Sequence, residues 1–175
     1  AKVLLKRGNY VLVNDGKNEE LHDQDKIREL KELGCHFLFG SHDVNLLEEG
    51  FDYLIKNPGI RIDHEYVLKA RSLGIPVINE VELAYQLLRD DITLIGIIGT
   101  NGKTTTTMLT YEILKAAYGD RVHLAGNIGY PLCSILDKVK KDDIVVMEVS
   151  CQQSENIIEF HPHIALITNY SPAHI

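Results

Sequence analysis

A short segment rich in glycine and threonine constrains this chain more than any other feature. The apolar run Leu94–Ile98 leads into Gly99-Thr-Asn-Gly-Lys-Thr-Thr105, and residues 103–117 then follow a helical pattern. An apolar strand, a glycine turn and a helix start, in this order, are the context of a phosphate-binding loop. Glycine lets backbone N–H groups turn toward an anion, and the helix start adds unpaired N–H groups and roughly half a positive charge. We therefore predict a phosphate-binding loop in a parallel α/β domain.

The side chains of this loop suit ATP and Mg²⁺. Lys103 is expected to reach the β- and γ-phosphate oxygens as a catalytic residue, and the Thr104 hydroxyl is expected to coordinate Mg²⁺. A plain glycine turn would not explain a lysine followed by four threonines, which are mediocre helix formers. The spacing Gly-x-x-Gly-Lys-Thr marks a subtype of the general motif. The predicted ATP-binding residues are Gly99, Thr100, Asn101, Gly102, Lys103, Thr104 and Thr105.

Further polar residues follow the ends of predicted strands, where ligands of parallel sheets gather. Glu148 ends an apolar strand and is predicted to be a second Mg²⁺ ligand, with a solvated surface glutamate as the alternative. His174 follows the strand 163–168 and could meet metal or substrate as a catalytic group, or be an ordinary loop histidine. Asn127 could hold a polar substrate or simply form a turn.

The rest of the chain alternates strand and helix patterns, which predicts two α/β domains with parallel sheets. We place a Rossmann-like domain at residues 1–91 and an ATP-binding domain resembling a P-loop NTPase at residues 92–175, with the boundary near Asp91. Residues 1–8 resemble the end of a helix, and the last predicted strand ends a few residues before the end of the chain. We therefore expect both domains to be incomplete. The predicted strands are 10–14, 36–39, 53–55, 76–78, 92–98, 122–124, 144–148 and 163–168, and the predicted helices are 25–33, 65–73, 80–88, 103–117 and 132–139.

Composition excludes several classes of protein. With 45 % hydrophobic residues the chain can bury a real core, and a net charge of −7 without a dense basic stretch argues against a nucleic-acid partner. No apolar run approaches the ~18 residues of a membrane span, and no signal sequence opens the chain. Cys35, Cys133 and Cys151 lack the paired spacing of a zinc site or a disulfide framework, which favours a reducing cytoplasm.

Four motifs together resemble the Mur ligase family in order and spacing: Gly96–Thr106, Gly126–Gly129, Glu148–Ser150 and Asn169–His174. The resemblance implies an ATP-dependent acid–amino-acid ligase of peptidoglycan precursor synthesis, a cytoplasmic pathway that serves cell-wall growth, cell shape and cell division. It implies ATP and Mg²⁺ as cofactors, with Thr104, Glu148 and His174 near metal.

Three stretches of the first half resemble the branch of this family that adds D-glutamate: Val13–Lys17, Lys56–Ile60 and Asn79–Leu83. The resemblance implies that ATP phosphorylates the carboxylate of UDP-N-acetylmuramoyl-L-alanine, that the amine of D-glutamate then attacks, and that the full-length protein is a monomer. The residues that it implies for substrate binding are Asp15, Gly16, Lys17, Asn57, Pro58, Gly59, Asn127, Ser150 and Gln153.

Two alternatives stay open at this point. Another Mur ligase, such as the one that adds the third residue, shares the loop and Glu148–Ser150. A non-catalytic ATP-binding module would fit the unusual residues Cys151 and Gln152, of which Cys151 is expected to be a packed thiol rather than a nucleophile. Since the family's carboxy-terminal domain is absent from these 175 residues, we expect this piece alone to be inactive.

Overall fold

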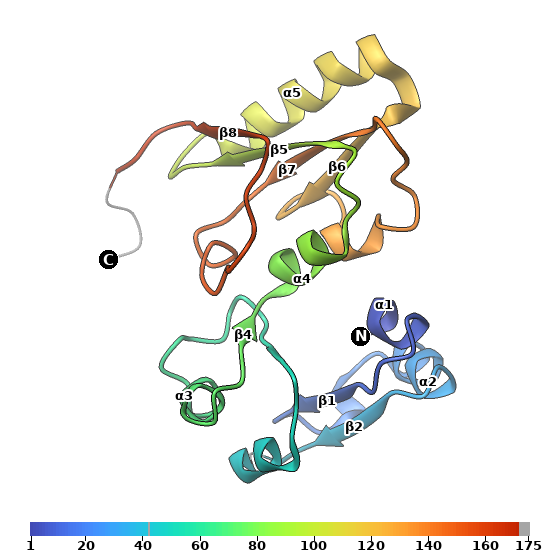
Figure 1. Ribbon diagram of the computed structural model, residues 1–175, viewed down its shortest axis with the longest axis vertical. Coiled ribbons are helices and arrows are strands. Elements are labelled where there is room, and N and C mark those ends of the chain that lie inside the picture. Colours follow the sequence, from blue (N-terminus) through green and yellow to red (C-terminus); the bar gives the residue numbers. More distant parts are fainter. Residues whose placement is uncertain (42, 172–175) are drawn as a thin grey trace. The chain divides into compact units, whose positions relative to one another are not determined.

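A computed structural model describes residues 1–41 and 43–171 of the chain. The chain forms two compact units, Ala1–Gly50 and Phe51–Ile175, each of which is described by itself (Figure 1). The domain boundary predicted near Asp91 lies inside the second unit and stays a prediction about the division of the protein. No helix among the described residues combines the length and the apolar character that a membrane span requires.

The first unit is a small parallel βαβ arrangement. Strand β1 pairs in parallel with β2, from Leu12 opposite His36 to Asp15 opposite Phe39. The Asp23 side chain accepts hydrogen bonds from the first turn of α2, which fixes the start of that helix. The elements are α1 Lys2–Lys6, β1 Leu12–Asp15, η1 Glu19–Leu21, α2 Gln24–Glu32, β2 His36–Phe39 and η2 Val44–Glu49.

The second unit begins with a second two-stranded parallel sheet. Strand β3 (Leu54–Ile55) pairs with β4 (Val77–Ile78), and helix α3 (Glu65–Ser72) connects them. Helix α4 (Glu80–Leu87) follows directly. The parallel pairing is as predicted, although β1–β2 and β3–β4 form separate sheets rather than one.

A four-stranded parallel sheet carries the rest of the second unit. Its strand order is β6-β7-β5-β8, so β5, which precedes the phosphate loop, is an inner strand. Ile97 lies opposite Glu148, and Glu148 lies opposite Gly126, so three strands end at one edge. The elements are β5 Thr93–Ile98, α5 Lys103–Tyr118, η3 Gly119–Arg121, β6 Val122–Gly126, η4 Leu132–Ser134, β7 Ile144–Glu148 and β8 Ile164–Ile167.

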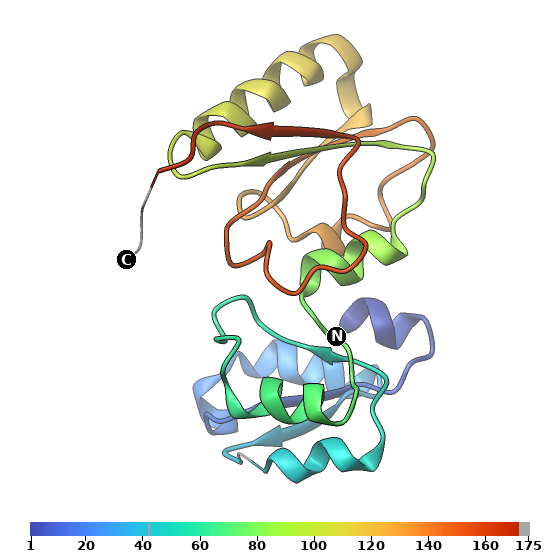
Figure 2. The ribbon, with the colours of Figure 1, turned by 60° about the vertical axis from the view of Figure 1, so that its left-hand side comes forward.

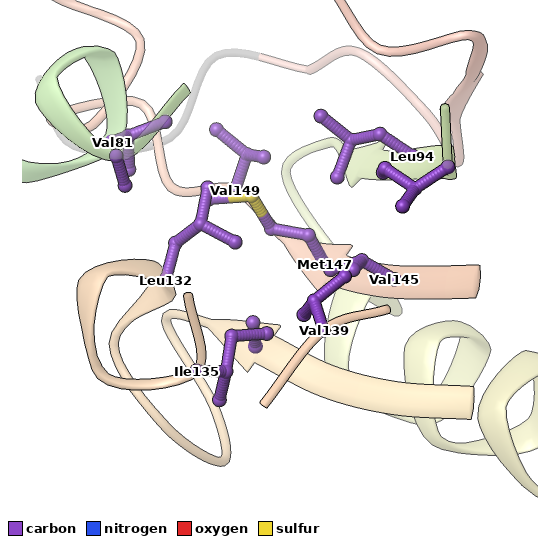
Figure 3. Packing of buried hydrophobic residues seen from close by; sticks show 11 residues of the cluster. Val81, Leu94, Leu132, Ile135, Val139, Val145, Met147 and Val149 are labelled. Atoms are coloured by element: carbon purple, nitrogen blue, oxygen red, sulfur yellow. The ribbon is translucent and has the colours of Figure 1, made fainter. Parts of the chain in front are cut away.

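Both faces of this sheet are packed around the inner strands β5 and β7, as their apolar residues require, whereas the edge strand β8 is exposed. On one face Ile95, Ile97 and Val146 pack with residues of α5. On the other face Leu94 and Met147 pack with α4 and η4, so that α4 shares a core with β5 and β7 (Figures 2 and 3). Alternate residues of one strand thus serve opposite layers.

One predicted helix is wrong. Residues 132–139 form the 3₁₀ turn η4 followed by further turns, not an α-helix. Leu132, Ile135 and Val139 are all buried, as a helical pattern demands. Because Leu132 and Ile135 are three residues apart, which suits a 3₁₀ turn as well as an α-helix, the start of this pattern could not separate the two.

Candidate functional site

Two glycines shape the loop between β5 and α5. Gly99 has φ +150°, and a Cβ added there would lie 2.1 Å from the Thr168 hydroxyl oxygen, so a larger residue does not fit. Gly102 has φ +78° and is the N-cap of α5, without a side-chain hydrogen bond to the helix start. The first N–H groups of α5 therefore keep the character of an anion-binding helix start.

The segment after β8 braces this loop. Asn169 accepts a hydrogen bond from the Asn101 N–H at 3.0 Å through its side chain, and its own amide nitrogen donates to the Asn101 carbonyl at 2.8 Å. The Thr168 hydroxyl donates to the same carbonyl at 2.7 Å, and the Thr100 hydroxyl donates to the Ser171 carbonyl at 3.0 Å. These contacts fix the loop backbone. No local sequence pattern predicts this role of Asn169.

Lys103 and the threonines after it lie at the start of α5. The Lys103 ammonium donates to the Thr100 carbonyl at 3.1 Å, so the side chain folds back over the loop. Thr104 and Thr105 are exposed. The structure thus brings the seven predicted ATP-binding residues together in one loop and the first turn of one helix.

Glu148 lies at the centre of a polar corner beside the loop. It is 1 % exposed, and each carboxylate oxygen accepts one hydrogen bond at 2.8 Å, from the Thr104 hydroxyl and from the Asn127 side-chain amide. The Asn127 N–H also donates to the Glu148 carbonyl at 2.9 Å. A Cβ on Gly126 would lie 2.1 Å from that carbonyl, so the close approach requires glycine. Three residues predicted separately therefore meet at one point.

The Thr104 and Glu148 oxygens fit a magnesium site. Neighbouring ligands of an octahedral Mg²⁺ lie about 2.8–3.0 Å apart, given ligand distances of about 2.0–2.1 Å, and these two oxygens lie 2.8 Å apart. Among the described residues no cluster of three His, Cys, Asp or Glu side chains could hold a metal. Mg²⁺ at phosphate sites is usually held by one or two protein groups together with substrate phosphates. His174, the third predicted ligand, lies outside the described residues.

A compact turn contains Ser150 and Gln153. The Gln153 side chain accepts a hydrogen bond from the Ser150 N–H at 3.0 Å, and the Ser150 hydroxyl accepts one from the Gln153 N–H at 3.2 Å. Cys151, at the tip of the turn, is exposed, so the expectation of a packed thiol is wrong. The reason is that the reciprocal bonds of Ser150 and Gln153 close the turn beneath it.

The predicted substrate loop Asn57–Gly59 lies beside this turn. The Asn57 side chain accepts a hydrogen bond from the Gly59 N–H at 2.9 Å. Lys56, which is buried, donates to the Ile60 carbonyl at 2.7 Å and pairs with the Glu155 carboxylate at 3.7 Å. A cavity of about 400 Å³ is lined by Pro58, Gly59, Ile60, Arg61, Ile62, Asp63, Gln152 and Glu155.

The remaining predicted substrate residues, Asp15, Gly16 and Lys17, lie in the first unit. They follow β1, and the Asp15 side chain accepts a hydrogen bond from the Lys17 N–H at 2.9 Å. The Gly40 N–H, at the end of β2, donates to the Asp15 carbonyl at 2.9 Å. The predicted substrate set is thus divided between the two units.

Comparisons with known proteins identify the relatives of this chain. Residues 97–175 match the model of the Mur ligase middle domain. Over its whole length the chain is 48 % identical to a UDP-N-acetylmuramoylalanine–D-glutamate ligase of Enterococcus hirae and 47 % identical to those of Streptococcus agalactiae and Lactococcus lactis. It spans 37 % of the first relative and 38 % of the other two.

Solved structures support the fold. One of them is the UDP-N-acetylmuramate:L-alanyl-gamma-D-glutamyl-meso-diaminopimelate ligase of Neisseria meningitides. The match covers 99 % of this chain and 57 % of the chain of that ligase, with a TM-score of 0.55 and 18 % sequence identity. Residues 97–175 thus match the Mur ligase middle domain, and the whole chain is similar in sequence to ligases of that family. The three sequence relatives named above are D-glutamate ligases.

Proposed function

We propose that this chain is part of an ATP-dependent ligase that joins D-glutamate to UDP-N-acetylmuramoyl-L-alanine in the cytoplasm, and that the whole protein is a monomer. The main support is the polar corner in which Thr104 and Asn127 both donate hydrogen bonds to Glu148. This corner lies beside the glycine loop that leads into helix α5. Such a corner joins a phosphate cradle to a metal site and to a neutral amide. The identity of 47–48 % to D-glutamate ligases supports this amino acid.

The chemistry needs a leaving group on the substrate carboxylate. Transfer of the γ-phosphoryl group of ATP forms a bond from a carboxylate oxygen to phosphorus and breaks the bond to ADP. The amine of D-glutamate then attacks the acyl carbon, so that an amide forms and inorganic phosphate and a proton leave. Thr104 and Glu148 would hold Mg²⁺, which would supply positive charge to the phosphates.

The residues of this chain bind and orient the reactants. The loop N–H groups and Lys103 hold the phosphates of ATP, so that the γ-phosphorus faces the substrate carboxylate. Asn127, Ser150 and Gln153 contact the muramoyl part, while residues 57–59 and 15–17 hold its nucleotide. His174 stays a predicted catalytic residue near the metal.

The test is ADP release by the full-length protein with both substrates. Wild-type protein should release ADP only when UDP-N-acetylmuramoyl-L-alanine and D-glutamate are both present. Lys103→Ala should lower kcat about 10²-fold or more, because a charge at the transferring phosphoryl group is lost. Lys115→Ala is the matched control, since this lysine lies on the same helix and donates to the Tyr111 hydroxyl.

Other outcomes point to the alternatives. ADP release with a different amino acid or a longer peptide substrate would assign the protein to another Mur ligase activity. ATP binding without any substrate-dependent turnover would favour a non-catalytic module.

A further inference from the structure

Asn79, at the start of α4, uses both ends of its side-chain amide. Its oxygen accepts hydrogen bonds from the N–H groups of Val81 at 3.0 Å and Glu82 at 3.1 Å, which caps the helix. Its nitrogen donates to the carbonyls of Gln153 at 2.8 Å and Glu155 at 2.6 Å. Asn79 is fully buried. The side-chain oxygen alone would suffice to cap the helix. The side-chain nitrogen therefore serves to hold the segment around residue 154.

The two carbonyls that Asn79 holds belong to residues with separate connections to the candidate site. The Gln153 side chain closes the turn with Ser150. The Glu155 carboxylate pairs with buried Lys56, which directly precedes the loop Asn57–Gly59. Asn79 therefore lies where the two predicted substrate segments of the second unit are joined.

Glu82, one turn further along α4, holds the same segment from its other end. Its carboxylate accepts hydrogen bonds from three successive N–H groups, those of Ile158 at 2.9 Å, Glu159 at 3.0 Å and Phe160 at 2.9 Å. This carboxylate is fully buried. The segment 153–160 is thus fixed to one helix at both ends, while Cys151 and Gln152, within the Ser150–Gln153 turn, stay exposed.

We propose that Asn79 is a positioning residue for the nucleotide-sugar substrate. It holds the Ser150–Gln153 turn beside the Asn57–Gly59 loop, so that both segments can bind one substrate molecule. This inference rests on the proposed function. Loss of the Asn79 side-chain N–H donor should loosen the turn and weaken binding of the sugar substrate. ATP is held by a different loop and should bind as before.

The decisive variant is Asn79→Ser in the full-length protein. Serine is as good an N-cap as asparagine but has no donor that reaches two carbonyls, so the helix start is kept and the link is lost. Ile135→Val is the matched control, because it removes one methyl group from the core that α4 shares and leaves both carbonyls bound.

Two measurements decide the question. In Asn79→Ser, the hydrogen-exchange rates of the Gln153 and Ser154 amides should rise about tenfold, while those of α5 stay unchanged. KM for UDP-N-acetylmuramoyl-L-alanine should also rise about tenfold, while KM for ATP stays constant. In Ile135→Val neither pattern should appear. Equal effects in both variants, or faster exchange throughout the second unit, would overturn the proposal.

The two proposals fail in different ways. If wild-type protein releases no ADP with these substrates, the proposed function fails. In that case the exchange pattern alone decides whether Asn79 holds the turn: faster exchange confined to residues 150–155 supports the link, and uniform exchange refutes it.

Discussion

At the residue scale, Glu148 has the environment that sets it apart from a surface carboxylate. Both of its oxygens are engaged, by Thr104 and Asn127, and it is buried. Glu148→Gln keeps the shape and a hydrogen-bond partner for each neighbour but removes the charge that would face Mg²⁺. We expect kcat to fall about 10²-fold or more and the Mg²⁺ concentration for half-maximal activity to rise. Glu112→Gln, an exposed change on α5, is the control, and an unchanged Mg²⁺ requirement in Glu148→Gln would count against the metal role.

Residues of the loop could be found from sequence because phosphate binding imposes a local order of residue types. Lys103 and Thr104 belong to a contiguous motif, and Glu148 ends a strand that the apolar pattern locates. The side chains that brace the site could not be found in this way. Asn79 and Asn169 bind backbone groups about 70 residues away, and such contacts leave no local pattern.

At the element scale, the starts of β6 and β7 are joined by a hydrogen bond between His123 and Asp143. The Asp143 carboxylate accepts hydrogen bonds from the Lys140 N–H at 2.8 Å and from His123 Nε2 at 2.7 Å. Burial raises the pKa of Asp143, but these hydrogen bonds and the nearby positive charges outweigh it, so the pKa is lowered. A carboxylate with a lowered folded pKa stabilises the fold above its unfolded pKa, near 4, and loses that contribution as the pH falls through the folded value.

The loss of stability caused by Asp143→Asn should therefore depend on pH. We expect a loss of about 1–3 kcal/mol in the free energy of unfolding at pH 7, and a smaller difference from wild type at pH 3. Urea denaturation at the two pH values measures both. Asp52→Asn, at an exposed position, should change the free energy of unfolding little at either pH. An equal loss of stability in Asp143→Asn at both pH values would contradict the lowered pKa of Asp143.

Helices and strands were predicted correctly where the spacing of apolar residues fits only one kind of secondary structure. The bounds of β2 and β7 are as predicted, because short runs of β-branched or aromatic residues between polar turns favour a strand. The segment 132–139 failed because its apolar spacing fits two kinds of turn. Neighbouring packing, not local pattern, decided between them, since Leu132 and Ile135 fill the core beneath β7.

At the scale of the whole molecule, the sequence and the structure suggest different partners for α4. The sequence pattern groups it with residues 1–91, whereas in the structure Val81 and Ala84 pack in the same core as Leu94 and Met147. Ligand binding to a native state stabilises whatever unfolds together with the site, by about 2.7 kcal/mol at a ligand concentration of 100 Kd. The response of α4 to a ligand of the phosphate loop therefore reveals the unit to which it belongs.

Saturating Mg²⁺ and ATP should slow hydrogen exchange in α4 and β7 together, and should leave β1 and β2 unchanged. The reason is that α4 cannot open without exposing the apolar side chains that it shares with the sheet behind the loop. Lys103→Ala with ATP is the control, because it removes a predicted phosphate contact without altering that core. If α4 instead kept its exchange rate while β7 slowed, α4 would open independently of the ATP-binding sheet, and the boundary near Asp91 would describe the protein better than the one at Gly50.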